Sequence, residues 1–419
     1  MSKLQQLIDT LCPDGVEYKT IKEIATDIYR GSGIKRDEVT EDGIPCVRYG
    51  EIYTTYGICF DKCVSHTVLE NVKTPKYFEY GDILFAITGE SVEEIAKSTA
   101  YVGNEKCLAG GDIVVLKHTQ NPKYLSYALS TTNAQMQKSK GKVKSKVVHS
   151  SVPAIESIII PVPPLEVQSE IVRILDNFTE LTAELTAELT ARKQQYEYYR
   201  RKLLNVECGI RNAECGMNGV PVVMKPMEEV FDMKNGYTPS KKVPEFWENG
   251  TLPWFRMEDI RANGRILSDS IQHITPQAVK GKLFPANSII LATTATIGEH
   301  ALIIADSLAN QRFTFFTKCK SLNVELDMKY AFYYFFIIDE WCKQNTNVSS
   351  FPSVDMSKLR KYQFPIPPID EQKRIVDILD RFDKLCNDIS EGLPAEIKAR
   401  QKQYAYYRDK LLTFKEIKT

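Results

Sequence analysis

One short stretch near the N-terminus has the residue types of a metal-dependent nuclease. Pro13, Asp14, Glu17 and Lys19 follow a PD…ExK pattern, in which two carboxylates would hold a divalent metal ion. In such nucleases the carboxylates come from adjacent strands, whereas only two residues separate the two parts of the pattern here. The related stretch in the second half of the chain, 220–225, has no carboxylate. This pattern therefore does not predict a nuclease site.

Other catalytic signatures are also missing. The Pro-Pro pairs lie in Val162–Leu165 and Ile366–Ile369 rather than in the [DNS]PP[YF] tetrapeptide of an amino-methyltransferase, and no GxGxxG or phosphate-binding loop occurs. The 5 histidines have no matched positions in the two halves. The 10 cysteines form no CxxC pair, which disfavours zinc and disulfides and favours a reducing cytoplasm. We therefore expect no catalytic residue, metal or cofactor on this chain.

A lysine-rich stretch gives the clearest sign of binding chemistry. No acidic residue occurs between Asp112 and Glu156, and every second residue of 138–146 is a lysine: Lys138, Lys140, Lys142, Lys144 and Lys146. Lysines of this kind contact nucleic-acid phosphates, and the release of counterions makes such binding strong and salt-dependent. Because the formal net charge is +0, any such binding must come from local patches. The alternative is a solvated basic loop.

The matching stretch of the second half, 343–351, is nearly uncharged and rich in amides and hydroxyls. Amide side chains can pair with adenine edges, whereas Lys and Arg favour guanine or phosphate. The candidate base-reading residues here are Gln344, Asn345 and Asn347. Further candidates, each equally consistent with an ordinary surface or sheet residue, are Arg48, Tyr49, Arg256, Arg261 and Arg265.

These loops must be positioned by a repeated helical element. Residues 161–204 recur at 365–412, first at an offset of 204 and then, beyond the TAEL repeats of 182–189, at an offset of 208. Each copy begins at a Pro-Pro pair, which can start a helix but not lie inside one. The first copy predicts a helix of about 40 residues, or roughly 60 Å. Gly392 and Pro394 predict a break in the second copy near 390–395.

The segments before the two helices also correspond. Residues 44–52 resemble 252–260, 81–88 resemble 286–294, and 123–127 resemble 329–333. Short β-branched runs at 83–87, 113–116, 288–292 and 312–316 predict strands, and 124–129 and 328–338 predict helices. The class is therefore α+β: two repeated domains, each a small mixed sheet with helices, joined by two long helices. The expected segments are 1–163, 164–208 (ending in a loop that spans 205–219), 209–366 and 367–419.

The bulk composition fits a globular protein, with 43% hydrophobic and 26% charged residues. The start of the chain lacks a signal-peptide pattern, and no run of 18 apolar residues occurs. We therefore expect no membrane span and a cytoplasmic location.

With its PIPPIDEQKRIVDILD stretch at 365–380, the related stretch at 161–176, the TAEL repeats and Cys12–Gly15, the chain resembles the specificity subunit of type I restriction-modification systems. The resemblance covers the whole chain and implies two target recognition domains, each reading one half of an asymmetric bipartite DNA site. It implies that the helices form an antiparallel coiled coil, set the spacer and dock two methyltransferase subunits. Val167–Glu170 departs from the family pattern Glu-Gln-x-Arg, which Glu371–Arg374 keeps, so equal docking on the two copies does not follow.

The resemblance places S-adenosylmethionine and adenine methylation on the methyltransferase subunits, and ATP-dependent, Mg-requiring cleavage on restriction subunits. Residues of the helix seam are the candidates for coiled-coil packing and subunit docking: Ile171, Ile174, Phe178, Leu181, Leu185, Leu189, Tyr196, Tyr199, Ile375, Ile378, Phe382, Leu385, Tyr404 and Tyr407. A self-sufficient DNA-processing enzyme with an unrecognised site is the alternative, and a scaffold that binds only protein is a third, which the lysine-rich stretch disfavours.

Overall fold

The computed structural model describes residues 2–140, 142, 146–204, 222–347, 352–388 and 391–417. The chain forms two compact units. The first contains Met1–Thr186 together with Glu396–Thr419, and the second contains Ala187–Ala395. Each unit holds one domain of sheets and helices plus parts of the long helices, so the predicted fold class is confirmed. The first unit is not contiguous in sequence, because its last helix comes from the C-terminal segment.

The first domain is built on two five-stranded mixed sheets. One has the order β2-β12-β8-β10-β5, formed by Ala25–Arg30, Ile113–His118, Ile83–Ala86, Ser98–Tyr101 and Cys59–Phe60. The other has the order β3-β6-β4-β11-β7, formed by Val39–Thr40, Ser65–Thr67, Ile44–Val47, Cys107–Ala109 and Tyr77–Phe78. Two strand pairs, β1 with β14 and β9 with β13, are formed by Tyr18–Thr20, Ile159–Pro161, Thr88–Gly89 and Val148–His149. The second sheet was not predicted.

Short helices surround these sheets. The α-helices of the first domain are α1 to α6, at Lys3–Leu11, Ile21–Ile24, Tyr49–Thr54, Pro122–Leu129, Thr132–Ser139 and Val152–Glu156. Two 3-10 turns, η1 and η2, lie at Arg36–Glu38 and Leu69–Asn71. The predicted helix at 124–129 is therefore confirmed as α4.

The second domain repeats this plan with a smaller second sheet. Its five-stranded sheet has the order β16-β23-β20-β21-β18, formed by Phe231–Asn235, Phe313–Lys318, Ser288–Ala292, His300–Ile303 and Ile266–Leu267. The three-stranded sheet β19-β17-β22 and the pairs β15-β26 and β24-β25 are formed by His273–Ile274, Leu252–Phe255, Leu308–Ala309, Val223–Pro226, Gln363–Ile366, Thr346–Asn347 and Ser353–Val354. Its helices α9 to α12 and turns η3 and η4 lie at Met227–Val230, Met257–Asn263, Met328–Gln344, Met356–Lys361, Pro244–Phe246 and Pro276–Ala278.

The central strand of each domain is apolar throughout because both of its faces are covered. In β8, Ile83 and Phe85 belong to one hydrophobic core and Leu84 and Ala86 to another. The residues of β20 alternate between two cores in the same way. Alternating side chains of a strand point to opposite faces, so a strand packed on both sides reads as a continuous apolar run. This explains why the runs at 83–87 and 288–292 predicted strands correctly.

The correspondence of 44–52 with 252–260 has a local structural basis. In each copy a strand, β4 or β17, passes into a short helix, α3 or α10, through an arginine at the N-cap. Glu51 Oε2 accepts the Arg48 N–H at 3.1 Å, and Asp259 Oδ2 accepts the Arg256 N–H at 2.6 Å. The repeated Arg-x-x-acid spacing is therefore a helix-capping device.

The repeated helices follow the predicted pattern. Helix α7 spans Leu165–Leu204 without interruption over 40 residues. The second copy is divided into α13, Ile369–Asn387, and α14, Leu393–Leu411. A Cβ at Gly392 would lie 2.6 Å from the Lys384 carbonyl oxygen, so glycine is required at the break. The predicted interruption near 390–395 is confirmed. Within the described residues, no helix has the length and apolar character needed to cross a membrane.

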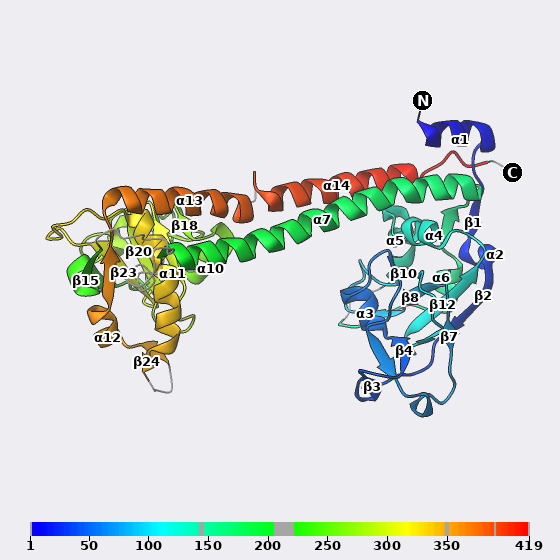
Figure 1. The fold of residues 1–419 in the computed structure, drawn as a ribbon, viewed down its shortest axis with the longest axis horizontal. Helices are drawn as coiled ribbons and strands as arrows, with labels where there is room; N and C mark the ends of the chain where they lie inside the picture. The colour runs from blue at the N-terminus through cyan, green and yellow to red at the C-terminus, as the bar shows by residue number, and fades with distance from the viewer. Residues whose placement is uncertain are drawn as a thin grey trace. The chain divides into compact units, whose positions relative to one another are not determined.

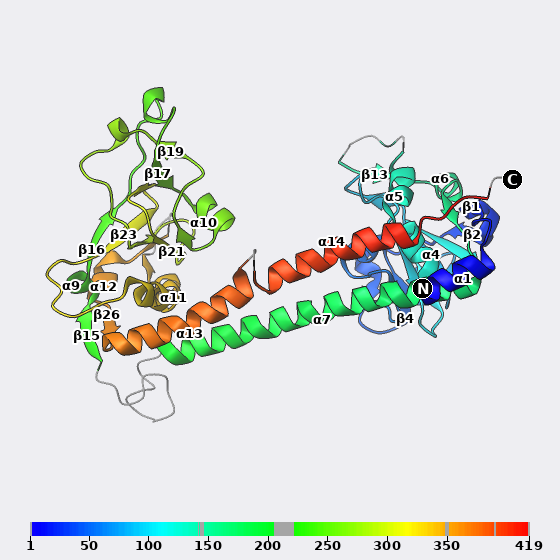
Figure 2. The same ribbon diagram turned by 90° about the horizontal axis from the view of Figure 1, so that it is seen from above.

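Each unit pairs two helical segments through equivalent aromatic rings. In the first unit Phe178 of α7 stacks on Tyr407 of α14, with ring centroids 5.5 Å apart. In the second unit Phe382 of α13 stacks on Tyr199 of α7 at 5.6 Å. Both views show α14 beside the N-terminal part of α7 and α13 beside its C-terminal part, as the predicted antiparallel pairing requires (Figures 1 and 2).

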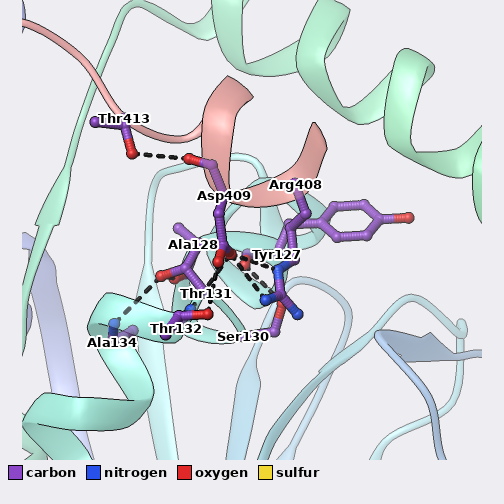
Figure 3. A network of polar contacts seen from close by, with 9 residues as sticks. All are labelled: Tyr127, Ala128, Ser130, Thr131, Thr132, Ala134, Arg408, Asp409 and Thr413. Carbon is purple, nitrogen blue, oxygen red and sulfur yellow. Dashed lines mark hydrogen bonds and ion pairs between the residues drawn. The ribbon is translucent and has the colours of Figure 1, made fainter. Parts of the chain in front are cut away.

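A polar network attaches α14 to the first domain (Figure 3). Asp409 Oδ2 accepts the Thr132 hydroxyl at 2.6 Å, and its Oδ1 accepts the Thr132 N–H at 3.3 Å. Arg408 donates from Nε and Nη2 to the same carboxylate at 2.9 and 2.8 Å. Burial disfavours the charged carboxylate, but the hydrogen bonds from Thr132 and Arg408 outweigh it and lower the pKa of Asp409. The carboxylate therefore joins the C-terminal helix to the start of α5.

Replacing Asp409 with Asn should lower the stability of the first unit by about 1 kcal/mol at neutral pH, because the neutral amide is a weaker acceptor. Since the folded pKa is lowered, the advantage of the wild type should be complete above the unfolded pKa of about 3.9 and be lost as the pH falls. Thermal unfolding and hydrogen exchange in α5 and α14 would measure this. Glu396→Gln on the same helix is the control, because its exposed pair with Arg400 should contribute less than about 0.5 kcal/mol. Equal losses in the two variants would contradict the assignment.

Candidate nucleic-acid interface

The lysine-rich stretch is divided in the structure, because Lys138 is buried. Its side chain is 4% exposed, and its Nζ donates to the Leu129 carbonyl oxygen at 2.8 Å and lies 3.4 Å from the Ser98 hydroxyl. The ammonium also lies 5.8 Å from the centre of the Phe85 ring. Burial lowers the pKa of Lys138 to about 7. Contrary to the prediction, Lys138 therefore does not belong to the surface that a phosphate could reach.

The remaining lysines begin where α5 ends. Lys140 is the C-cap of α5 and is exposed, as is Lys146, and Lys142 is half-buried. Lys144 lies outside the described residues. The alternating pattern of the sequence thus starts inside a helix, where side chains two residues apart do not share a face. Only the part after Ser139 can form the predicted basic surface.

The amide-rich stretch occupies the matching place after α11. Gln344 is the last residue of α11 and Asn347 ends β24; both are exposed. Asn345 is the C-cap, and its Nδ2 donates to the Trp341 carbonyl oxygen at 2.9 Å. The amide nitrogen of Asn345 is therefore already used in capping the helix. Residues 348–351 of this stretch lie outside the described residues. Gln344 and Asn347 are the amides best placed to meet a ligand.

The two arginines at the helix caps are partly committed to structure. Arg48 Nε lies 3.1 Å from Glu51, and the guanidinium of Arg256 lies 5.7 Å from the centre of the Trp254 ring. Tyr49, directly after the first cap, is 39% exposed. Arg261 is exposed on α10. Tyr49 and Arg261 are therefore freer for a ligand than Arg48 and Arg256.

Arg265 lies at the edge of a cleft in the second unit. Its Nη1 donates to the His300 carbonyl oxygen at 2.9 Å, and its guanidinium lies 5.1 Å from the centre of the Phe336 ring. The cleft has a volume of about 1140 Å³. Its charged lining residues are Arg200, Arg201, Arg265, Lys343, Glu197, Glu299, Asp339 and Glu340. Because acidic and basic groups are balanced, this cleft is not a basic surface.

A buried histidine that the sequence did not single out ties α11 to β21. His300 Nδ1 lies 2.7 Å from Asp339 Oδ2, and its Nε2 lies 3.0 Å from the Phe332 carbonyl oxygen. Both ring nitrogens therefore lie within hydrogen-bond distance of an oxygen atom. His300 is fully buried. The sequence around it has no motif that would have predicted a buried histidine–aspartate contact. We assign the pair to holding α11 in place.

The PD…ExK pattern does not form a metal site. Lys19 pairs with Glu17 at 2.6 Å on the surface of the first unit. Across the described ranges, no cluster of three or more His, Cys, Asp and Glu side chains is placed to hold a metal ion.

The predicted seam residues do not share one environment. Ile171 and Ile375 are fully buried in the cores of their own domains, with Ile174, Ile378, Leu189 and Tyr404 packed at the edges of these cores. Phe178, Phe382, Tyr196, Tyr199 and Tyr407 take part in ring contacts between helices. Leu181, Leu385, Tyr199 and Tyr407 keep at least 36% of their surface exposed, whereas Leu185 is half-buried. The residues buried in the domain cores are therefore not available to a partner subunit.

Two exposed tyrosines were missed as docking candidates. Tyr198 is 59% exposed and Tyr406 is 61% exposed, and these residues are related by the offset of 208. Lys202 lies 5.9 Å from the centre of the Tyr198 ring, and Lys410 lies 5.7 Å from that of Tyr406. The Tyr-x-Tyr-Tyr spacing, which occurs in both copies, could have indicated them, because it places the middle tyrosine (Tyr198 or Tyr406) outside the helix seam.

Comparison with known proteins gives a consistent result. Residues 13–192 and 220–399 each match the family described as the type I restriction modification DNA specificity domain. The EcoprrI specificity subunit of a type I restriction enzyme from Escherichia coli is 53% identical over 48% of this chain, and the match spans only 52% of that protein's own length. A second type I restriction enzyme specificity subunit from Escherichia coli is 39% identical over 71% of this chain and 72% of its own length.

Solved structures show the same fold at low sequence identity. A chain from a study of complex assembly in the type I R-M system aligns with a TM-score of 0.64 and 16% identity, covering 95% of this chain and 97% of that chain. The HsdS subunit from Thermoanaerobacter tengcongensis aligns with a TM-score of 0.53 and 16% identity, covering 96% of each chain. With two copies of the specificity domain that together account for most of its length, this chain belongs to the type I restriction-modification specificity subunit family.

Proposed function

We propose that this protein is the sequence-specific DNA-recognition subunit of a type I restriction-modification complex and has no catalytic site of its own. Each domain reads one half of an asymmetric, gapped DNA site, with the N-terminal domain on the first half. The paired helices set the unread spacer between the halves. The complex acts in the cytoplasm.

One observation carries this proposal. The two domains repeat the same central sheet and the same helix attachment, but the stretch after α5 in the first domain and the stretch after α11 in the second differ in chemistry. It is lysine-rich in the first domain and amide-rich in the second. A repeated scaffold with different side chains at one position is what two different half-sites would require, because bases are distinguished by their donor and acceptor patterns.

The exposed helix residues support the partner assignment. Leu181 and Leu385, and the tyrosine pairs Tyr198–Tyr199 and Tyr406–Tyr407, occur on both helical segments and leave apolar surface uncovered. We infer that two methyltransferase subunits, which bind S-adenosylmethionine and methylate adenine, dock on these surfaces. Restriction subunits, which use ATP and Mg for cleavage, then join through the methyltransferase subunits.

The test is to co-express the chain with a cognate type I methyltransferase subunit in a methylation-free host and to map methyladenine across the genome. A single asymmetric, gapped motif is expected. The purified chain alone should neither cut nor methylate DNA, and activity of the chain alone would favour a self-sufficient enzyme. A stable complex of the two proteins that neither methylates nor binds DNA would overturn the recognition role.

Lys140 and Lys142 should contribute to DNA affinity through phosphate contacts. Replacing either with Gln should weaken binding of the methyltransferase complex and reduce the slope of log K against log salt by about 0.9 per lost contact, because fewer counterions are released. Fluorescence anisotropy with a duplex carrying the mapped motif, at several salt concentrations, measures the slope.

Lys138→Met is the matched control for these lysines, because the Lys138 ammonium is buried and bonded to the Leu129 carbonyl oxygen. The salt slope of this variant should equal that of the wild type. Since burial lowers the pKa of Lys138 to about 7, the wild type should instead gain stability relative to the variant as the pH rises from about 7 to about 10. A slope that falls for Lys138→Met but not for Lys140→Gln would reverse the assignment.

The TAEL repeats should set the spacer length. Deleting Thr186–Leu189 removes about 6 Å of helix, and DNA rises about 3.4 Å per base pair, so the mapped spacer should shorten by one or two base pairs with both half-sites unchanged. Inserting a further TAEL unit should lengthen the spacer by the same amount. Methyladenine mapping distinguishes these outcomes from altered half-sites, which would exclude a pure spacer role.

A further inference from the structure

The repeated sequence Lys-Tyr-x-x-Tyr, at 123–127 and 329–333, forms a clamp on the helix that leaves each domain. In the first unit, Asp176 of α7 accepts two hydrogen bonds from α4. Lys123 Nζ lies 2.7 Å from Asp176 Oδ2, and the Tyr127 hydroxyl lies 2.8 Å from Oδ1. The carboxylate is therefore held by a cation on one oxygen and a hydroxyl on the other.

The second unit has the same clamp. Asp380 of α13 accepts Lys329 Nζ on Oδ2 at 2.6 Å and the Tyr333 hydroxyl on Oδ1 at 2.6 Å, both from α11. The aspartates are related by the offset of 204, and their partners by 206. The two lysine–aspartate pairs also have nearly equal exposure, with each side chain between 34% and 37% exposed. The clamp is thus reproduced in position, partners and environment.

A buried glutamine forms a second joint near the start of each helix. Gln168 is fully buried. Its Oε1 accepts the Asn121 N–H at 3.0 Å, and its Nε2 donates to the Pro163 carbonyl oxygen and the Gln120 Oε1, both at 2.8 Å. Asn121 is the N-cap of α4. One side chain therefore joins the start of α7 to the start of the helix that carries the clamp.

Gln372 forms the equivalent joint in the second unit and is also fully buried. Its Oε1 accepts the Asp327 N–H at 2.8 Å, and its Nε2 donates to the carbonyl oxygens of Pro367 at 2.7 Å and Glu325 at 2.9 Å. Asp327 is the N-cap of α11. The glutamine is therefore present in both copies, although the other residues of the Glu-Gln-x-Arg pattern differ between them.

The first tyrosine of each repeated motif completes the joint. The Tyr124 hydroxyl donates to the Pro161 carbonyl oxygen at 2.9 Å, and the Tyr330 hydroxyl donates to that of Pro365 at 3.2 Å. All three residues that recur in the Lys-Tyr-x-x-Tyr repeat are thereby assigned a partner, and all three bind the helix or the chain directly before it.

Two hydrogen-bonded joints on one helix restrict the position of the domain on that helix more than a single joint does. The glutamine and the aspartate lie eight residues apart, about 12 Å along the helix, which is just over two turns. The hydrophobic contribution of the apolar contacts between helix and domain is non-directional. Charge-assisted hydrogen bonds are short and directional. Together, the two joints hold a domain at one rotation and one height on its helix.

From this geometry we propose that Asp176 and Asp380, with their Lys–Tyr partners and the buried glutamines, are positioning residues that make the spacer length strict. The inference rests on the proposed function. Adding one base pair to the spacer moves a half-site by about 3.4 Å and rotates it by about 35°, since B-DNA has about 10.5 base pairs per turn. A clamped domain cannot follow that movement. A domain with a loosened clamp can follow it, so discrimination against a wrong spacer falls.

The test uses the methyltransferase complex and duplexes that carry the mapped half-sites with the mapped spacer, one base pair less or one more. Asp176→Ala and Asp380→Ala each remove both hydrogen bonds of one clamp and should reduce the affinity ratio between the correct and wrong spacers by at least about tenfold, because losing even one hydrogen bond to a charged group has about that effect. The double variant should lose more. Glu188→Ala, which breaks an exposed pair with Arg192 on α7, should leave the ratio unchanged.

Tyr127→Phe and Tyr333→Phe remove one hydroxyl each and keep the rings, so they provide a second test where an alanine variant fails to assemble. Both should show the same loss of spacer discrimination to a smaller degree. Unchanged ratios in assembled phenylalanine variants, or a uniform loss of affinity for all three spacers, would overturn the proposal. A wild-type complex without any spacer preference would instead overturn the proposed function itself.

Discussion

The structure depends on the attachment of each domain to its helix by directional hydrogen bonds. A glutamine amide that is fully buried must have its donors and acceptor satisfied, because an unpaired buried polar group costs about 1–3 kcal/mol. Gln168 meets this requirement through bonds to the segment before α7 and to the N-cap of α4, so these two parts must lie in one arrangement. Gln372 places the same requirement on the segment before α13 and the N-cap of α11. Apolar packing around them adds stability.

Repetition within the chain separates the residues that build the scaffold from those that read a ligand. The glutamines, the clamping aspartates and the stacked Phe178–Tyr407 and Phe382–Tyr199 pairs recur with nearly equal geometry. The stretches after α5 and α11 do not recur. The acidic residue that ties α14 to α5, Asp409, also has no acidic counterpart, because Arg201 occupies the matching position on α7. That difference follows the fold, since α11 continues as one helix where the first domain starts a new one at α5.

The candidate DNA-binding surface is smaller than charge patterning alone indicated. Lys138 belongs to a run of alternating lysines, yet it points inwards because the run starts on the last turn of α5. Arg48 and Arg256 are repeated because they sit at helix caps opposite Glu51 and Asp259. The recurrence of these arginines in both domains therefore reflects helix capping and not DNA recognition. The chemistry assigned to DNA rests on residues without a counterpart: Lys140, Lys142, Gln344 and Asn347.

The sequence by itself determined the family, the repeated α+β plan, the long helix after Pro164 and the break at Gly392, because offsets, proline positions and apolar runs are local properties of the chain. It also marked the Lys-Tyr-x-x-Tyr repeat without indicating its role. Only the tertiary structure decided that this repeat clamps Asp176 and Asp380, that Lys138 is buried and that residues 396–419 complete the first unit. Those outcomes depend on contacts between residues far apart in the chain, where burial and partner geometry, rather than residue type, set what a side chain does.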